Sequence, residues 1–295
     1  TIGVLLAGGT GSRLYPLTTS VNKHLLPVYS KPLIYYSLST LMLAQNRKIL
    51  IVINPKDEVD FRNLLGDGSQ FGIELEYVKQ DKPRGLADGL YACKKIIKDR
   101  NVNLILGDNI FYGKGLQDLL LKNKENKLNC FFSQEVKNPE NFGVVDRDEN
   151  SKALKIIEKP KNPTSSEALL GLYFYDNEVF QYIETLEPSL RDELEITDLN
   201  NKYLSEKSTN IVNIGRGISW FDAGTIEDLY EANNFIQAIE KRQDTLIGSL
   251  EEVSINNGWL EKTELEKKIT NNKISPLNIV YISFVQPHTF SMRFL

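Results

Sequence analysis

The sequence predicts an α/β fold: a mostly parallel, mixed sheet flanked by helices on both faces, with an inserted antiparallel portion. In the first third of the chain, short apolar runs alternate with segments of helical period, which is the rhythm of β-α-β-α units. Between residues 129 and 175, strand-like runs follow one another closely with few helical segments between them, which favours antiparallel pairing. The composition, 41% hydrophobic and 25% charged, is ordinary for a globular chain with a large core.

The parallel half depends on buried strands and on the helices that follow them. Apolar runs without polar alternation are typical of strands covered on both faces. Pro32 suits the first turn of a helix that runs to about Ala44. A second helix is expected over residues 85–97. The strands expected in this half are Ile2–Ala7, Lys48–Ile53 and Val102–Leu106.

The rest of the chain is expected to contribute antiparallel strands and one long helix. The segment 225–241 places its apolar residues along one helical face. The segment 279–285 is apolar and strand-like, but nothing in the sequence places it in the fold. The antiparallel strands are expected at residues 129–134, 142–145, 153–157 and 168–175.

Charge and cysteine content exclude several classes of protein. A net charge of -4 and a pI near 5.5 provide no basic field, so we expect no nucleic-acid partner. Two scattered cysteines and two histidines are too few for a zinc framework or a disulfide scaffold. The apolar run at Ile2–Ala7 lacks the basic lead of a signal peptide, and no apolar stretch approaches the ~20 residues that span a bilayer. We therefore expect a cytoplasmic protein with no membrane contact.

The strongest chemical signal is a glycine-rich loop directly after the first strand. Its backbone N–H groups can approach an anion closely and donate to phosphate oxygens. Arg13 adds a permanently charged, bidentate clamp. The spacing fits neither the dinucleotide fingerprint nor a Walker loop, and a tight turn without a ligand is the alternative interpretation. The loop residues are Gly8, Gly9, Thr10 and Gly11.

A second cation and two aspartates complete the candidate catalytic set. Lys23 lies soon after the glycine loop and suits a triphosphate, although a lysine alone is more typical of a solvated surface. Asp108 follows a buried strand, where carboxylates commonly hold Mg²⁺ against phosphate oxygens. Asp222 precedes a long helix and is the candidate second metal ligand. A helix cap or a turn is the alternative role of both aspartates.

Two further charged segments are weaker candidates for a sugar-phosphate site. Lys159, fixed before Pro160, can grip a monophosphate. Glu158 and Glu195 can accept hydrogen bonds from sugar hydroxyls. Each of these residues is also typical of a solvated surface charge.

Taken together, these segments resemble the sugar nucleotidyltransferase family, and within it the glucose-1-phosphate thymidylyltransferases. The similarity covers roughly residues 1–260. It implies the Rossmann-like, nucleotide-diphospho-sugar transferase type of sheet. It also implies a catalytic domain over 1–242 (nucleotide half about 1–110, sugar-binding half about 111–225) and a small C-terminal appendage over 243–295. The matching segments are 8–18, 23–27, 32–44, 65–68, 107–109, 171–176 and 193–198.

The resemblance also implies a reaction and a role for each candidate residue. The sugar phosphate of glucose 1-phosphate would attack the α-phosphorus of dTTP in line, with Mg²⁺, giving dTDP-glucose and pyrophosphate. Arg13, Lys23, Asp108 and Asp222 would be catalytic, and the two aspartates would hold the metal. The glycine loop would bind the triphosphate, and Gln80 and Gly85 would recognise thymine. The sugar-phosphate pocket would be lined by Gly143, Glu158, Lys159, Gly171 and Glu195.

Some positions depart from the pattern of this subgroup and leave alternatives open. His24 stands where glutamine is usual, Leu170 beside the sugar pocket where a hydroxyl residue is usual, and Ala223 where threonine is common. These changes are either neutral or indicate another sugar phosphate, such as an amino sugar. UTP in place of dTTP, and a non-catalytic sugar-nucleotide sensor, are further alternatives. The family is often tetrameric, and Tyr112, Gly113 and Arg216 fall in segments that resemble its feedback site.

Overall fold

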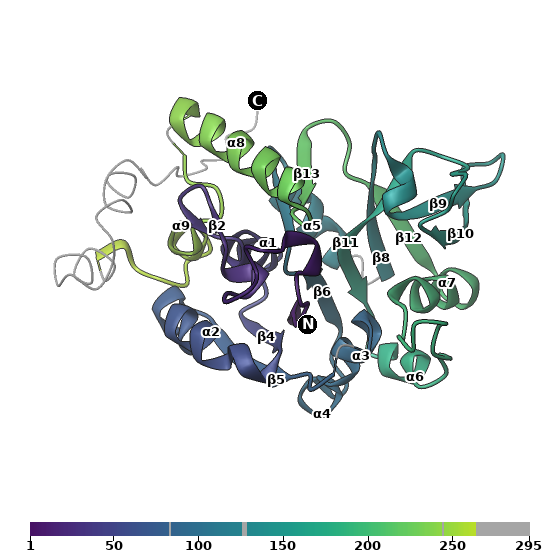
Figure 1. Cartoon of the computed structure of the whole chain (residues 1–295), viewed down its shortest axis with the longest axis horizontal. Helices are drawn as coiled ribbons and strands as arrows, with labels where there is room; N and C mark the ends of the chain where they lie inside the picture. The colour runs from purple at the N-terminus through teal and green to yellow at the C-terminus, as the bar shows by residue number, and fades with distance from the viewer. Residues whose placement is uncertain (83, 126–128, 244, 264–295) are drawn as a thin grey trace, which may run out of the picture.

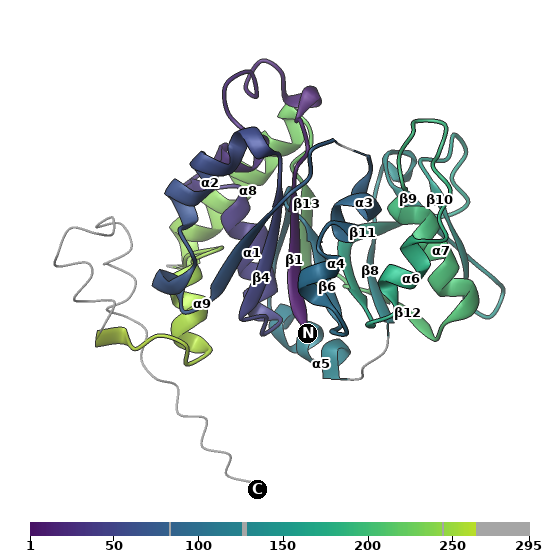
Figure 2. The ribbon, with the colours of Figure 1, turned by 90° about the horizontal axis from the view of Figure 1, so that it is seen from below.

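The structure is a computed structural model that describes residues 1–82, 84–125, 129–243 and 245–263. Its centre is one large mixed sheet, with helices packed on both faces (Figures 1 and 2). The main path of the sheet is β10 (Ala153–Glu158), β9 (Gly143–Arg147), β11 (Glu167–Tyr175), β6 (Val102–Leu106), β1 (Ile2–Ala7), β4 (Lys48–Ile53) and β5 (Glu74–Lys79). Off this path, β8 (Asn129–Glu135) pairs with β11, and β12 (Thr209–Asn213) pairs with β8.

The two halves of the sheet differ in strand direction, as the sequence predicts. Strands β5, β4, β1 and β6 run parallel to one another. Strand β11 is antiparallel to β6, β8 and β9, and β9 is antiparallel to β10. The predicted fold class, a mostly parallel sheet with an inserted antiparallel portion, is confirmed.

The side chains of β1 explain why its sequence is apolar without interruption. Leu5 and Ala7 belong to one core cluster, and Val4 and Leu6 belong to another, because successive residues of a strand point to opposite faces. The first cluster is covered by α1 (Ile34–Leu43), α2 (Glu58–Leu65), α5 (Leu116–Glu125) and α9 (Leu250–Asn256). The second is covered by α3 (Leu86–Tyr91), α4 (Lys94–Ile97), α6 (Val179–Ile183) and α7 (Ile196–Glu206).

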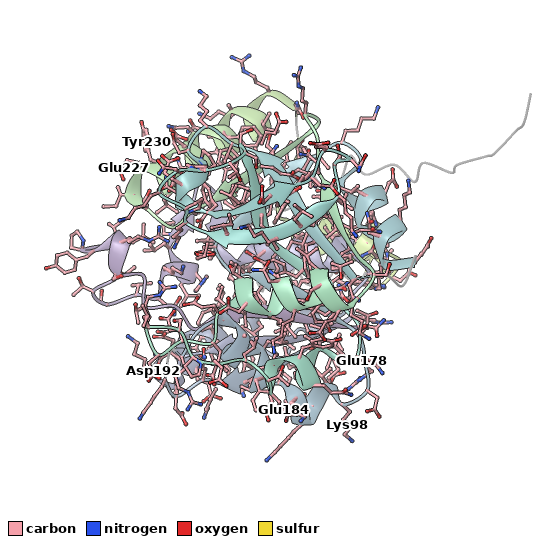
Figure 3. All side chains as sticks on the ribbon, turned by 90° about the vertical axis from the view of Figure 1, so that its right-hand side faces the viewer. Lys98, Glu178, Glu184, Asp192, Glu227 and Tyr230 are labelled. Atoms are coloured by element: carbon pink, nitrogen blue, oxygen red, sulfur yellow. The ribbon has the colours of Figure 1, made fainter. Side chains whose placement is uncertain are left out.

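A third, smaller core cluster holds α8 (Ile226–Gln243) against the N-terminal loops. Leu229, Ala232 and Ile236 of this helix pack in the same cluster as Leu14 and Tyr36. The opposite face of α8 meets solvent, where Glu227 and Tyr230 are seen in Figure 3. Next to α8, β7 (Asn109–Gly113) and β13 (Ile218–Asp222) form a separate antiparallel pair. Among the described residues, no helix is long and apolar enough to cross a membrane.

Two predicted helices differ from those observed. The first begins at Ile34 rather than Pro32, because Pro32 pairs with Pro27 in the two-residue strands β2 (Pro27–Val28) and β3 (Lys31–Pro32). The helix predicted over residues 85–97 is two short helices, because the chain tightens where Cys93 N donates to Leu90 O. The predicted strands and the long helix are observed with small shifts at their ends. The segment 279–285 lies outside the described residues.

Candidate active site

Most of the candidate residues line one cavity at the carboxyl ends of the parallel strands. The cavity, of about 410 Å³, lies between these strand ends and the inserted antiparallel half. Open α/β sheets bind ligands at this edge because the loops that follow successive parallel strands converge there. The predicted residues that line it are Gly8, Gly9, Thr10, Arg13, Lys23, Gln80, Gly85, Asp108, Gly143, Glu158, Lys159, Gly171, Glu195 and Asp222.

Gly11 is the member of the predicted nucleotide-binding set that does not line the cavity. Its φ of 65° lies in the left-handed region, where glycine costs least. Thr18 Oγ1 donates to Gly11 O at 2.8 Å, and a Cβ added to Gly11 would lie 2.8 Å from Thr18 Cγ2. Gly11 therefore shapes the turn of the loop, whereas Gly8 and Gly9 face the cavity.

Lys23 and Asp108 form a partly buried ion pair beside the glycine loop. Burial alone would raise the pKa of Asp108, but the charge of Lys23, with hydrogen bonds from Lys23 and Asn109, lowers it below its usual range. The aliphatic end of Lys23 also lies against the loop, since a Cβ on Gly9 would be 3.2 Å from Lys23 Cε. The Asp108 carboxylate is therefore held ionised next to backbone that can bind an anion.

Asp222 is brought to Asp108 by the pairing of β7 with β13. In this register Asp222 lies opposite Asn109, and Ala223 N donates to Asp108 O at 2.9 Å. Burial raises the pKa of Asp222, and the negative charge of Asp108 raises it further, against the opposing charges of Lys23 and Arg13. The two carboxylates thus share one corner of the cavity, in which Asp108 is buried and Asp222 is half-buried.

This corner fits a magnesium ion in the chemistry of its donors. Mg²⁺ prefers oxygen ligands and is usually held by one or two carboxylates, with phosphate oxygens and water completing its shell. Within the described residues, no group of three or more His, Cys, Asp or Glu side chains could enclose a metal. A cation beside Asp108 and Asp222 would also offset the like-charge repulsion that raises the pKa of Asp222.

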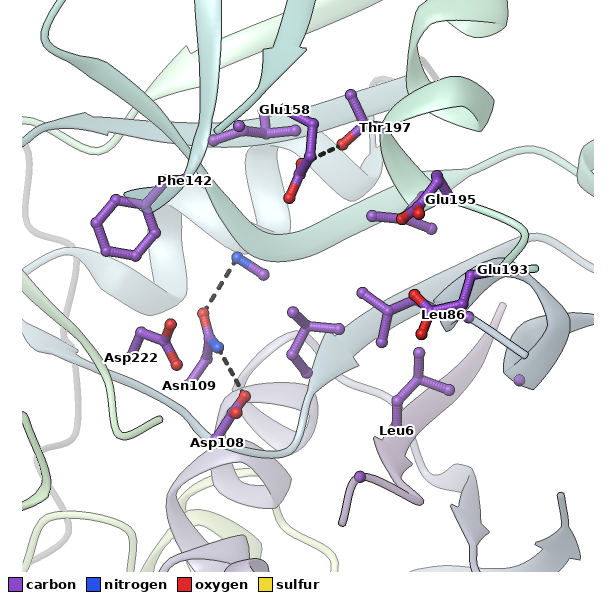
Figure 4. A pocket seen from close by; sticks show the side chains of 18 of the residues that line it. Leu6, Leu86, Asp108, Asn109, Phe142, Glu158, Glu193, Glu195, Thr197 and Asp222 are labelled. Atoms are coloured by element: carbon purple, nitrogen blue, oxygen red, sulfur yellow. Dashed lines mark hydrogen bonds between the residues drawn. The ribbon is translucent and has the colours of Figure 1, made fainter. Parts of the chain in front are cut away.

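Asn109 orients this corner of the cavity, although it was not among the residues predicted for the site. Its Oδ1 accepts from Gly171 N at 3.1 Å and from Trp220 Nε1 at 2.7 Å. Its Nδ2 consequently faces Asp108 and donates to Oδ1 at 3.1 Å (Figure 4). A Cβ on Gly171 would lie 2.7 Å from Asn109 Oδ1, so this contact requires glycine at 171. A buried amide with both ends committed can hold the carboxylate in one orientation.

The opposite wall of the cavity comes from the inserted half. Thr197 Oγ1, at the start of α7, donates to Glu158 Oε2 at 2.6 Å, and Figure 4 shows both side chains above Asp108. The rings of Phe142 and Trp220 meet edge to face with centroids 5.2 Å apart. Lys159 is half exposed, and its Nζ lies 3.7 Å from Glu158 Oε1 on the same wall. Carboxylates and a hydroxyl on this wall suit a polyhydroxylated ligand.

Comparison with known proteins places this arrangement in a family. The family model described as nucleotidyl transferase matches residues 2–239. The chain belongs to the nucleotidyl transferase family.

Two relatives in this family share one name. Over 266 residues the chain is 48% identical to the glucose-1-phosphate thymidylyltransferase of Neisseria meningitidis, covering 90% of this chain and 92% of that protein. The protein of the same name from Mycolicibacterium smegmatis is 44% identical, with coverages of 89% and 91%. The resemblance drawn from the sequence motifs is confirmed.

Solved structures of nucleotidyl transferases share the fold. A Bacillus anthracis protein crystallised with sucrose, provisionally assigned as a glucose-1-phosphate thymidylyltransferase, has a TM-score of 0.73 and 40% identity. The match covers 79% of this chain and 94% of that one. A UDP-glucose pyrophosphorylase has a TM-score of 0.70 at 22% identity, and that likeness concerns the fold alone.

Two departures from the subgroup pattern lie in different surroundings in this nucleotidyl transferase. His24 lines the cavity, its Nδ1 lies 2.8 Å from Asn22 Oδ1, and burial with the charge of Lys23 lowers its pKa to about 3. Leu170, expected beside the sugar pocket, instead packs in the core cluster on the other face of the sheet. The residues that line the cavity there are Leu169 and Gly171, because alternate residues of β11 face opposite sides.

Several residues that line the cavity were not predicted from the sequence. Only the folded structure brings them to the cavity, since no local sequence motif distinguishes an Arg, Glu or Thr of the site from one on the surface. Asn109 is the exception, because it directly follows Asp108 at the end of a buried strand. The unpredicted lining residues that carry polar or aromatic groups include Asn109, Phe142, Tyr173, Arg191, Glu193, Thr197 and Trp220.

Proposed function

We propose that this protein transfers a thymidylyl group from dTTP to glucose 1-phosphate, giving dTDP-glucose and pyrophosphate. The observation that carries the proposal is a single cavity with two kinds of wall. The glycine loop, the Lys23–Asp108 pair and Asp222 form one wall, and the Glu158–Thr197 pair forms the other. Close relatives named glucose-1-phosphate thymidylyltransferase supply the substrate class.

The nucleotide triphosphate is assigned to the first wall. Backbone N–H groups of Gly8, Gly9 and Thr10 donate to phosphate oxygens, and Arg13 and Lys23 provide positive charge beside them. Gln80 and Gly85 are assigned to the thymine base. The Lys23 ammonium is already paired with Asp108, so it is held at the loop before a nucleotide arrives.

Magnesium is assigned to Asp108 and Asp222, with phosphate oxygens of the nucleotide as its further ligands. When bound, the ion supplies charge neutralisation between the two phosphate substrates. Lys23 and Asn109 keep the Asp108 carboxylate ionised and in one orientation.

The sugar phosphate is assigned to the second wall. Glu158 accepts from sugar hydroxyls, Lys159 binds the phosphate, and Glu195 lines the cavity beside them. Gly143 and Gly171 let the sugar approach the backbone. The sugar phosphate is itself a competent nucleophile, so the chain has to position it in line and needs no general base or covalent intermediate.

Two wider assignments accompany this function. We propose a catalytic domain over 1–242, divided near residues 110 and 225 into nucleotide and sugar halves, with residues 243–295 as an appendage. We further propose that the protein is cytoplasmic and forms a homo-oligomer, a tetramer by resemblance to the family. Light scattering on the purified protein tests the oligomeric state. A monomer across the working concentration range would exclude the oligomer.

Pyrophosphate release tests the proposed activity. The protein is supplied with Mg²⁺, one of dTTP, UTP, ATP, CTP or GTP, and one of several sugar 1-phosphates. We expect the highest kcat/KM for dTTP with glucose 1-phosphate, and no release in EDTA. A preference for another sugar or base would keep the proposed reaction but change its substrates. No release from any pair by folded protein would refute the proposed enzymatic activity.

A further inference from the structure

A chain of hydrogen bonds connects Gln80, Asp88 and Arg84 at one end of the cavity. Gln80 Nε2 donates to Asp88 Oδ2 at 2.8 Å and to Gly85 O at 3.3 Å. Arg84 donates to the other carboxylate oxygen, Oδ1, at 3.0 Å. Asp88 lies in α3 and is only 9% exposed, so its bond to Gln80 is shielded from water, whereas the Arg84 side chain is largely exposed. Gln80 lines the cavity, whereas Asp88 lies behind it.

The pairing fixes which end of the Gln80 amide faces the cavity. An ionised carboxylate accepts hydrogen bonds and cannot donate them, so the NH₂ group of Gln80 must face Asp88. The carbonyl of Gly85 accepts from the same NH₂ group and favours the same orientation. Arg84 occupies the second carboxylate oxygen, so Asp88 cannot rotate away without breaking an ion pair.

The other end of the amide, Oε1, lies beside two glycines, whose lack of side chains leaves space around this oxygen. A Cβ added to Gly8 or to Gly89 would lie 3.3 Å from Gln80 Oε1 in either case. Both glycines line the cavity, together with the partly exposed Leu86 and with Leu6. Glycine backbone beside leucine side chains, with one oriented acceptor at its edge, suits a planar ring that presents an N–H donor.

We propose that Asp88 is the positioning residue that sets base selectivity, by holding Gln80 Oε1 as a hydrogen-bond acceptor toward the base. Thymine presents an N3–H donor to such an acceptor, whereas cytosine places a lone pair on N3, where two acceptors would face each other. The inference rests on the proposed function, because it takes this part of the cavity as the base subsite. Asp88 acts through Gln80 and does not contact the base.

Two single variants, which weaken the Gln80–Asp88 hydrogen bond, and a double variant, which exchanges donor and acceptor, test this role. In Asp88→Asn the residue facing Gln80 can donate as well as accept, so only the longer bond to Gly85 O, at 3.3 Å, still favours the wild-type orientation of the Gln80 amide. In Gln80→Glu two carboxylates face each other. The double variant, Gln80→Glu with Asp88→Asn, restores one donor–acceptor pair and again leaves an acceptor oxygen toward the cavity.

The readout is the ratio of kcat/KM for dTTP over dCTP, measured on one preparation so that any unfolded fraction cancels. We expect this ratio to fall about tenfold or more in Asp88→Asn, the scale of a hydrogen bond replaced by a mismatch. It should fall further in Gln80→Glu and return to within about threefold of wild type in the double variant. Asp118→Asn is the control, because Asp118 is an exposed aspartate at the same position of α5, its third residue.

The outcomes separate this inference from the proposed function. Wild type without dTTP-dependent pyrophosphate release would refute the function itself. A wild type that prefers dTTP, with an unchanged ratio in Asp88→Asn, would overturn the positioning role. A double variant no more selective than Gln80→Glu would overturn it as well. Asp88→Ser, whose hydroxyl can also donate or accept, gives the same measurement if Asp88→Asn does not fold.

Discussion

Replacing Asn109 by leucine removes the amide that connects β7, β11 and β13. Asn109 is 2% exposed and makes three side-chain hydrogen bonds, to Gly171 N, Trp220 Nε1 and Asp108 Oδ1. A leucine of similar size keeps the packing but leaves the buried Gly171 N–H without its acceptor. The half-buried Trp220 N–H loses its acceptor too.

The expected cost follows from these orphaned groups. A buried donor left unsatisfied costs about 1–3 kcal/mol, and a half-buried one less, so we expect about 2–4 kcal/mol of lost stability in Asn109→Leu. Urea unfolding followed by circular dichroism measures it. Asn213→Leu is the matched control: Asn213 Oδ1 also accepts from a backbone N–H, that of Gly215, but at an exposed position. Its expected cost is within about 0.5 kcal/mol.

Catalysis should fall by a separate route. Without Asn109 Nδ2, the Asp108 carboxylate keeps Lys23 but loses the donor that fixes its orientation. We expect kcat for pyrophosphate release to fall about 10–100-fold in protein that is still folded at low temperature. Equal stability of Asn109→Leu and Asn213→Leu would refute the claim that the buried Asn109 amide stabilises the junction of β7, β11 and β13. An unchanged kcat would refute the claim that Asn109 orients the Asp108 carboxylate.

Three further predictions concern other residues of the site and its surroundings. Asp222→Asn should raise the melting temperature of the metal-free protein, because burial and the charge of Asp108 raise the pKa of Asp222. The same change should cut Mg²⁺-dependent turnover by about 10²–10³-fold, and a lower melting temperature with full activity would contradict both. His24, with a pKa lowered from 6.5 to about 3, stays neutral in the folded protein. The contribution of His24 to the free energy of unfolding is therefore greatest above pH 6.5 and declines as pH falls toward 3. Between pH 7.5 and 5, wild type should lose about 2 kcal/mol more than His24→Gln in urea unfolding, and equal losses would count against a neutral buried imidazole. Leu170→Thr should cost about 1–3 kcal/mol of stability because Leu170 is fully buried. Its ranking of sugar 1-phosphates should not change, and a change of preferred sugar would return Leu170 to the sugar pocket.

The sequence predicts the interior of the parallel half well, because strands buried on both faces consist of uninterrupted apolar residues. Strand β5 was not among the predicted strands, although the alternation of charged and apolar residues over Glu74–Lys79 is typical of a strand at the edge of a sheet with one solvated face. Leu170 was misplaced because neighbouring residues of β11 face opposite sides, and only the register settles which side holds the cavity. The glycine loop and Asp108 could be found from local pattern, since each directly follows a buried strand.

The relations between distant residues could not be read from the sequence. Nothing local indicates that Thr197 donates to Glu158, since both look like surface residues. The Gln80–Asp88 pair spans a strand end and a helix, and its meaning depends on which end of an amide faces the cavity. Such details follow from hydrogen-bond geometry, which sequence spacing does not determine.

The pairing of β7 with β13 has a consequence for the order in which the protein is made. During synthesis, the glycine loop, Lys23 and Asp108 leave the ribosome early, while Asp222 emerges much later, after the whole inserted half. Until β13 pairs with β7, the nascent chain holds the glycine loop but only one of the two carboxylates proposed to bind the metal. We therefore expect no turnover from a chain that stops before β13, the last strand among the described residues.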